Sequence, residues 1–174
     1  MKNQAFTLIE LLVVVLIIGI LAAIAVPKYE LSVEKSRISG VYNLLNSVRK
    51  AEEIYFLANR TYTDNIGDLD VDFPYNISEH NTYVHGGKYY WRICGGDTCM
   101  YATRQWKDGF YMIEVYFPEG DFVCVAQQNT KAQEICSALG YTRKFASSNY
   151  TPGVNVSRMK THYYSLPNSI RTEP

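Results

Sequence analysis

The chain has 174 residues, which is enough for one modest domain and an accessory segment. Its 17 basic residues balance its 17 acidic residues, so no overall positive charge favours nucleic acid as a partner. The four cysteines form an even set that follows an apolar amino-terminal run, which is typical of an exported domain with disulfides.

The apolar run extends from Phe6 to Val26 and contains one carboxylate, Glu10. About 20 residues suffice to span a bilayer as a helix, so the run predicts a membrane segment. A charged side chain there costs at least about 2.5 kcal/mol to insert, so an unpaired Glu10 suits a passive anchor poorly. We therefore expect Glu10 to have a partner. Lys2 predicts that the leader stays in the cytoplasm, with everything after Pro27 outside.

The start of the chain has a short basic leader, a small residue before an aromatic one, and then the carboxylate, in the order Met1-Lys2-Asn3-Gln4-Ala5-Phe6-Thr7-Leu8-Ile9-Glu10. With Gly19 and Pro27 further on, this pattern resembles the class III signal of type IV pilins and pseudopilins. The resemblance implies that a prepilin peptidase cuts between Ala5 and Phe6 and methylates the new amino group of Phe6. It also implies that Glu10 is the assembly carboxylate. The family usually has glycine before the cut, so Ala5 is a departure, although it is also small.

Such a cut would place the Phe6 ammonium four residues from the Glu10 carboxylate. Each charge is costly in lipid and loses most of that cost when it is paired. The pair can form within one subunit, because residues four apart share a helix face. Pairing between neighbouring subunits would instead stabilise the polymer, and the resemblance favours this intersubunit pair. An uncut, passive anchor is the alternative.

Beyond the membrane segment, apolar residues continue at steps of about three and four, which indicates one face of an amphipathic helix. They are Val41, Leu44, Leu45, Val48, Ala51, Ile54, Tyr55 and Ala58. We predict one helix from Phe6 to about Ala58, with a leader over 1–5, a membrane or filament-core half over 6–27 and an amphipathic half over 28–58. Gly19 and Pro27 predict a kink or an adjustable segment within the first half.

We expect residues 59–174 to form a globular head. Turn formers dominate Arg60–Asn81, which predicts a loop between helix and sheet. Strand-like runs follow, with turns at Lys107-Asp108-Gly109 and Pro118-Glu119-Gly120. The runs cover about Lys88–Cys94, Met100–Trp106, Phe110–Phe117 and Phe122–Ala126. We expect a four-stranded antiparallel sheet covered by the amphipathic half of the long helix, in an α+β fold.

A short helix is predicted over about Lys131–Leu139. Thr130 is its expected N-cap, Gln133 completes a capping box, and Gly140 ends the helix. The tail from Tyr141 to Pro174 is rich in Ser, Thr, Asn and Tyr, and we expect it to be irregular but docked on the head. The resemblance identifies the whole arrangement with the type IV pilin fold.

Cys94 and Cys99 flank a glycine-rich turn, while Cys124 and Cys136 connect the last predicted strand to the short helix. Pairing 94 with 99 and 124 with 136 is the most local of three connectivities, and the sequence leaves all three open. A four-thiolate zinc site is the alternative, although the spacing lacks paired C-x2-C motifs. The second bridge resembles the disulfide-bounded loop of pilin heads, which supports a pilin over a secretion pseudopilin.

Four carboxylates, Asp68, Asp70, Asp72 and Glu79, have the spacing of a calcium loop. Phe73 stands where such a loop needs glycine, so a solvated acidic loop without a metal is the preferred interpretation.

Residues 61–81 contain five acidic and no basic residues, whereas cations dominate the tail. The cations are Arg143, Lys144, Arg158, Lys160 and Arg171. Opposite patches of this kind could meet between neighbouring subunits. A contribution to solubility alone would explain the two charged patches equally well. DNA binding by these cations with Tyr150, Tyr163 and Tyr164 is the weaker alternative.

The three histidines, His80, His85 and His162, lie in no catalytic or metal-binding motif, so we expect neither an enzyme nor a cofactor. The prediction is a structural subunit of a type IV pilus, held in the bacterial inner membrane and then polymerised into an extracellular filament for adhesion, motility or uptake. Its expected partners are identical or related subunits, the prepilin peptidase and the assembly machinery. The alternatives are a type II secretion pseudopilin, a minor pilin that binds DNA or a surface ligand, and an exported domain that never polymerises.

Overall fold

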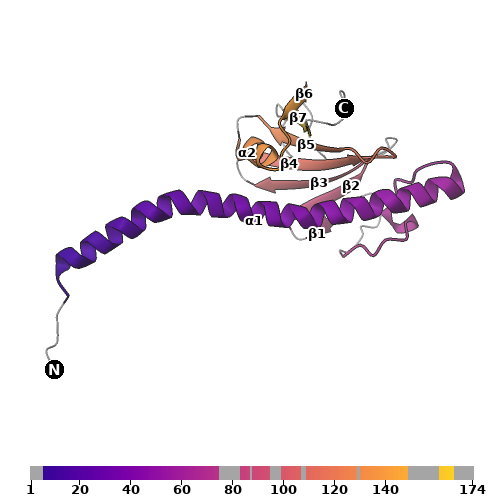
Figure 1. The fold of residues 1–174 in the computed structure, drawn as a ribbon. Coiled ribbons are helices and arrows are strands. Elements are labelled where there is room, and N and C mark those ends of the chain that lie inside the picture. The colour runs from indigo at the N-terminus through magenta and orange to yellow at the C-terminus, as the bar shows by residue number, and fades with distance from the viewer. Residues whose placement is uncertain are drawn as a thin grey trace. The chain divides into compact units, whose positions relative to one another are not determined.

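The computed structural model describes residues 6–74, 83–86, 88–94, 99–106, 109–128, 130–148 and 161–166. The chain forms two compact units, Met1–Arg37 and Ile38–Pro174. One long helix begins in the first unit and ends in the second, and the second unit contains the sheet and a short helix (Figure 1).

Helix α1 spans Leu8–Asn59 and is 52 residues long. The predicted single helix is therefore confirmed, with ends that differ by one or two residues from the expected ones. Pro27 lies inside the helix and does not interrupt it, although proline lacks the amide hydrogen for one intrahelical bond. The side chains of residues 6–30 are all exposed.

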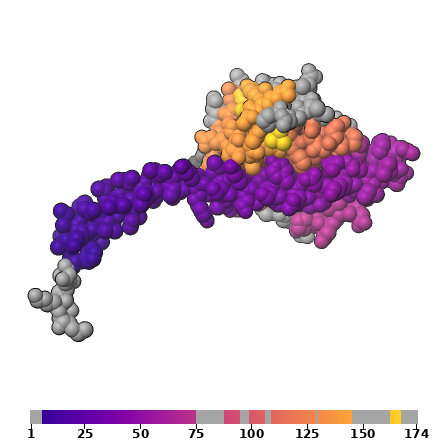
Figure 2. Space-filling view, viewed as in Figure 1, coloured from indigo at the N-terminus to yellow at the C-terminus, as the bar shows by residue number. Residues whose placement is uncertain are grey.

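The second half of α1 is amphipathic, and its buried apolar side chains are Ile38, Val41, Leu45, Val48 and Ala51. The expected face is wrong at its carboxyl end, because the side chain of Ile54 is 69% exposed. At 3.6 residues per turn, Ile54 lies about half a turn from Leu45 around the helix, which places it on the outer face. Figure 2 shows this half of α1 lying against the strands of the head.

The sheet has seven described strands, all antiparallel to their neighbours, in the order β1-β2-β3-β4-β5-β7-β6. Their bounds are Tyr83–Gly86 for β1, Tyr89–Ile93 for β2, Cys99–Trp106 for β3, Gly109–Tyr116 for β4, Phe122–Gln127 for β5, Arg143–Ser148 for β6 and Thr161–Ser165 for β7. The α+β class is confirmed, and the four predicted strands correspond to β2–β5. The predicted strand number is wrong.

The three additional strands include two from the tail that we expected to be irregular. Strand β7 pairs with β5, placing Tyr163 opposite Val125 and Tyr164 opposite Cys124, and β6 pairs with the other side of β7. Because β7 lies between β5 and a strand that precedes it in the chain, the arrangement depends on contacts that no local pattern encodes. The polar residues of these segments also conceal the alternation that marks a half-buried strand.

The two faces of the sheet are distinct. Strand β4 is buried along its whole length, and alternation sends its side chains to both faces. One face carries α2, as the bond between Cys124 and Cys136 of α2 shows. The second half of α1 packs on the same face, where the ring of Tyr42 lies edge-on to Phe122 of β5 at 5.0 Å. The other face carries a second apolar cluster, made of Cys99, Tyr101, Met112, Tyr116, Val123, Val125 and Tyr163.

Strands β3 and β4 form a hairpin in which Trp106 lies opposite Gly109. Of the predicted turn, Lys107 and Asp108 lie outside the described residues. The turn predicted after β4 contains Gly120, whose φ of +77° is a conformation that favours glycine. A guanidinium from α1 lies over this turn, because Arg49 donates from Nη1 to the carbonyl oxygen of Pro118 at 3.3 Å.

Helix α2 spans Lys131–Ala138, and its predicted N-cap at Thr130 and its end at Gly140 are confirmed. A side-chain hydrogen bond of Gln133 goes to the hydroxyl of Tyr164, so the capping box expected from Gln133 stays a prediction. The hydroxyl of Thr130 accepts from the amide of Ala132 at 3.3 Å. Gly140 has a φ of +97°, and the amides of Gly140 and Tyr141 donate to the carbonyls of Ser137 and Cys136. These two bonds form the Schellman arrangement that satisfies the last carbonyls of a helix.

Candidate functional site: the apolar helix and its carboxylate

The start of α1 is capped by reciprocal hydrogen bonds between Thr7 and Glu10. The backbone amide and the hydroxyl of Thr7 donate to Oε2 of Glu10 at 2.8 and 2.6 Å. The amide of Glu10 donates to the Thr7 hydroxyl at 3.3 Å. This geometry is a capping box, and it satisfies amides that would otherwise lack partners at the helix start.

The capping box gives Glu10 a role in the folded helix that the cost of charge in lipid does not predict. The Thr-x-x-Glu spacing that signals it is nevertheless present in the sequence. The box also fixes the position of the carboxylate, and a negative group at a helix amino terminus interacts favourably with the helix dipole. Glu10 is thus held at a defined place at the start of the apolar helix.

The expected partner, the amino group of Phe6, exists only after the chain is cut. In the uncut chain Phe6 has a peptide nitrogen, and Ala5 lies outside the described residues. The side chain of Phe6 is 76% exposed at the start of the helix. Within the described residues, the hydrogen bonds to the Glu10 carboxylate use Oε2. The pairing of Phe6 with Glu10 therefore stays a prediction.

The first half of α1 presents a continuous apolar surface. Large aliphatic side chains are exposed on every side of the helix along its whole first half. The exposed fraction is 87% at the first residue of α1, Leu8, and 52% at Val26, near the end of this half. Among the described residues, α1 is the one helix long and apolar enough to cross a membrane. Water-soluble monomers rarely expose apolar patches above a few hundred Å². This half of the helix therefore requires lipid or other apolar helices around it.

Gly19 and Pro27 both lie within this exposed helix. A Cβ added at Gly19 would meet no atom within 4 Å. The space beside Gly19 is therefore open in the single subunit, as it is along the rest of the apolar segment. The adjustable segment between these two residues stays a prediction.

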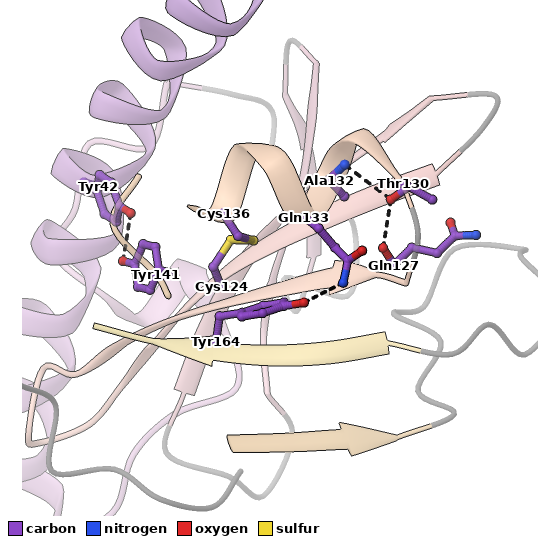
Figure 3. Close-up of a disulfide and its surroundings, with 9 residues drawn as sticks. All are labelled: Tyr42, Cys124, Gln127, Thr130, Ala132, Gln133, Cys136, Tyr141 and Tyr164. Carbon is purple, nitrogen blue, oxygen red and sulfur yellow. Dashed lines mark hydrogen bonds between the residues drawn. A yellow bond between two sulfur atoms is a disulfide. The ribbon is translucent and has the colours of Figure 1, made fainter. Parts of the chain in front are cut away.

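The head contains two disulfides, which join Cys94 to Cys99 and Cys124 to Cys136. They are the most local of the three possible pairings, and no described cysteine is left as a free thiol for zinc. Figure 3 shows the second bridge joining β5 to α2, flanked by two hydrogen bonds. These run from Tyr42 of α1 to the hydroxyl of Tyr141 at 2.8 Å, and from Gln133 of α2 to the hydroxyl of Tyr164 at 2.6 Å.

The acidic loop after α1 has its own internal structure. Asp68 accepts hydrogen bonds from the hydroxyl of Thr63 at 2.9 Å and from the side-chain amide of Asn65 at 2.9 Å. Within the described part of the chain, no group of three or more acidic, histidine or cysteine side chains is arranged to hold a metal. Glu79 of the calcium alternative lies outside the described residues, and Asp70 and Asp72 are exposed.

Of the three histidines, His162 on β7 is the one whose side chain the structure describes, and it is buried. Its Nε2 lies 3.4 Å from Nζ of Lys144. Burial, followed by the nearby Lys144 charge, lowers the pKa of His162 below its usual value of 6.5. This environment is that of a neutral residue within the sheet.

Glu52 is a carboxylate whose importance the sequence analysis missed. It is fully buried, and its Oε2 accepts a hydrogen bond from the amide of Thr63 at 3.2 Å. Burial raises its pKa to about 7; the Thr63 bond opposes this shift, whereas the charges of Asp64 and Asp68 add to it. The sequence does contain a signal, because Glu52 follows Val48 by four residues and so continues the buried face.

Comparisons with known proteins agree with these features. Residues 1–26 match a family model described as the prokaryotic N-terminal methylation motif. The type IV wide pilus major component PilA4 of Thermus thermophilus is 32% identical over 119 residues, which cover 60% of this chain and 91% of that protein. No solved structure matches the chain.

Two fimbrial proteins match over shorter lengths of the chain. The type IV major fimbrial protein FimA of Dichelobacter nodosus is 44% identical over 62 residues, covering 36% of this chain and 40% of that protein. The fimbrial protein EcpB of Eikenella corrodens is 50% identical over 52 residues, covering 30% of this chain and 33% of that protein. The match to PilA4 extends over nearly all of that relative, and the motif, the long helix and the disulfide-bonded head accompany it. The chain belongs to the type IV pilin family.

Proposed function

We propose that this protein is a structural subunit of a type IV pilus, which polymerises through the apolar half of α1 into an extracellular filament. Before assembly the subunit is held in the inner membrane by this half. A prepilin peptidase cuts between Ala5 and Phe6 and methylates Phe6, and the assembly machinery then extracts the subunit. The observation that carries the proposal is an apolar helix, exposed on all sides, with one carboxylate fixed at its start.

The hydrophobic effect alone does not favour the filament over the membrane. Burying a large aliphatic side chain away from water is worth about 1.5–3 kcal/mol, which explains why the helix avoids water. Lipid tails are as apolar as leucine side chains, however, so transfer from lipid to a bundle of like helices gains little from that effect. Another interaction must distinguish the two environments.

The charge pair supplies that difference. In lipid, Glu10 costs at least about 2.5 kcal/mol, and a new ammonium on Phe6 adds a further cost. The capping box already uses Oε2 of Glu10 and holds the carboxylate at the helix start. In the filament, the Phe6 ammonium of a neighbouring subunit binds this carboxylate, so that both charges are neutralised. The pair thereby sets the axial register of adjacent helices.

Substitution of Glu10 by valine tests this role. Glu10→Val removes the charge that makes the membrane unfavourable, and a loss of about 2.5 kcal/mol corresponds to at least about 50-fold less assembly at equilibrium. We expect the variant to accumulate in the membrane with its disulfides intact and to form few filaments. Thr7→Val is the matched control, because it removes the capping hydroxyl and keeps the carboxylate; it should retain most assembly.

Normal filaments made of Glu10→Val subunits alone would contradict the proposal. Deletion of the gene separates the related functions: loss of surface fibres supports the pilus subunit, whereas loss of protein secretion with fibres unchanged indicates a pseudopilin. Salt-sensitive retention of the purified protein on DNA, with normal fibres in the deletion strain, indicates a minor, ligand-binding pilin.

A further inference from the structure

The loop that follows α1 presents a row of exposed aspartates: Asp64, Asp68, Asp70 and Asp72. No cation of the described residues forms an ion pair with them. The loop is nevertheless held in place, because Ile66 and Leu69 are buried and the ring of Phe73 packs edge-on against Trp91 of β2 at 5.7 Å. The carboxylates are therefore a preformed negative surface, which we call the acidic loop.

A positive surface lies on strand β6. Arg143 and Lys144 begin this strand, and both are exposed. Residues 141–148 contain no acidic side chain. Strand β6 is the last strand in the sheet order, so these cations lie at one edge of the sheet. We call this edge the basic edge.

The acidic loop and the basic edge are on different sides of the head. The loop is fastened to β2, whereas β6 lies at the far end of the sheet order, with β3, β4, β5 and β7 between them. Figure 1 shows the loop and β6 on opposite sides of α1 within this unit. The two surfaces therefore cannot neutralise each other within one head.

From this separation we infer that the acidic loop of one subunit binds the basic edge of a second copy of the same chain. A two-fold symmetric dimer on either surface would place like charges against each other, which is unfavourable. A contact between two different surfaces is heterologous, and such a contact repeats from copy to copy, which gives an open filament when the rotation does not close a ring. The head thus carries its own head-to-tail contact.

This inference rests on the proposed function and adds to it the partner surface of the head. The helix pair between Phe6 and Glu10 sets the axial register, and the head contact sets the rotation of each head against the next. An exposed ion pair multiplies an association constant by at most about fivefold. A filament repeats the contact at every subunit, so small contributions govern its stability. The contact weakens as salt shortens the range of charge interactions.

Charge exchange in the full-length protein tests the contact. Arg143→Glu with Lys144→Glu reverses the basic edge, and Asp70→Lys with Asp72→Lys reverses the acidic loop; Asp68 is left unchanged because it holds the loop together. We expect each double variant to fold with intact disulfides and to lose at least about tenfold of its assembled protein at low salt. Added salt should reduce this loss, because it screens the new repulsion between like charges. Combining all four substitutions should restore assembly.

The control variant for reversal of the basic edge is Lys88→Glu with Lys131→Glu, which makes the same change in net charge as Arg143→Glu with Lys144→Glu at two exposed positions outside both surfaces. It should assemble as the wild type does. Because Arg143 has further contacts in the head, the pair Lys144→Glu and Asp70→Lys provides a second, smaller exchange with the same expected rescue.

Wild-type-like filaments from both reversed double variants would overturn the head contact and leave the proposed function intact. So would a combined variant that assembles no better than its parents while it folds normally. A wild-type protein that forms no filaments at all, in a strain whose other pili assemble, would instead overturn the proposed function.

Discussion

The buried carboxylate of Glu52 makes the stability of the head depend on pH. Its Oε2 is bonded to the amide of Thr63, whereas its Oε1 is buried and has no partner among the described residues. The unfolded chain exposes the carboxyl group, whose ordinary pKa is 4.5, and folding raises the pKa to about 7. The folded state therefore binds a proton more tightly than the unfolded state does. Stability contributed by this proton is complete below pH 4.5 and is lost as the pH rises towards 7.

The size of the effect follows from the shift. Each pKa unit corresponds to about 1.36 kcal/mol, so the full shift sets a ceiling of about 3 kcal/mol. Screening by nearby solvent and salt reduces this value, and we expect about 1–2 kcal/mol. Glu52→Gln keeps the shape of the side chain and an oxygen that can accept from Thr63, but it carries no charge. The variant should be about 1–2 kcal/mol more stable than the wild type at pH 8 and equal to it at pH 4.

The assay is urea unfolding of the full-length protein in detergent with its disulfides intact, followed by tryptophan fluorescence at pH 4, 6 and 8. Glu134→Gln on α2 removes an exposed carboxylate and serves as the control, with a pH profile close to that of the wild type. Parallel pH profiles for Glu52→Gln and the wild type would refute the reasoning. So would a variant that is less stable than the wild type at pH 8.

Three further substitutions test other parts of the structure. Gly120→Ala should destabilise the head by about 1–2 kcal/mol in the same unfolding assay, because φ is +77° there and the new Cβ would lie 3.1 Å from Nε of Arg49; an unchanged midpoint would contradict this. Cys124→Ser with Cys136→Ser should cost about 2–4 kcal/mol and should make the head more sensitive to protease; an unchanged unfolding midpoint and unchanged protease sensitivity would contradict this. Thr7→Val should lower the helix content of full-length protein in detergent near the amino terminus, measured by hydrogen exchange, because a lost N-cap costs about 1 kcal/mol; unaltered exchange at Glu10 would argue against the capping box.

The sequence predicts best where one local pattern determines the structure. The apolar run and the three-and-four spacing after it suffice to predict α1, and Thr130 and Gly140 suffice to predict the ends of α2. The hairpin between β3 and β4 follows from its short turn. In each case the interactions that stabilise the element are close in the sequence, so a local signal reflects them.

The sequence predicts the structure less well where contacts between residues far apart in the chain determine it. Strand β7 forms because β5 offers it an open edge, and β6 forms because β7 is in place, so neither is evident from its own residues. The burial of Glu52 similarly depends on the loop that returns to it at Thr63. Ile54 shows the opposite error, because an apolar residue at a roughly suitable spacing lies on the outer face once the helix rotation is fixed.

The functional site at the start of α1 could be predicted only in part from the sequence. The cost of one charge in an apolar run is sufficient to single out Glu10, and the resemblance to pilins names Phe6 as its partner. The bond between Glu10 and Thr7 requires knowledge of where the helix begins, because the same two residues two positions inside a helix would form no cap. The structure supplies that boundary at Leu8.

The most direct test of the proposed function is the amino-terminal sequence and intact mass of the subunit in filaments sheared from the cell surface. We expect a chain that begins at Phe6, carries one added methyl group on its amino nitrogen and contains two disulfides. Filaments built from a subunit that still begins at Met1 would contradict cleavage before Phe6 as a step of assembly. Surface filaments that lack this protein in a strain that processes it normally would contradict the proposed function.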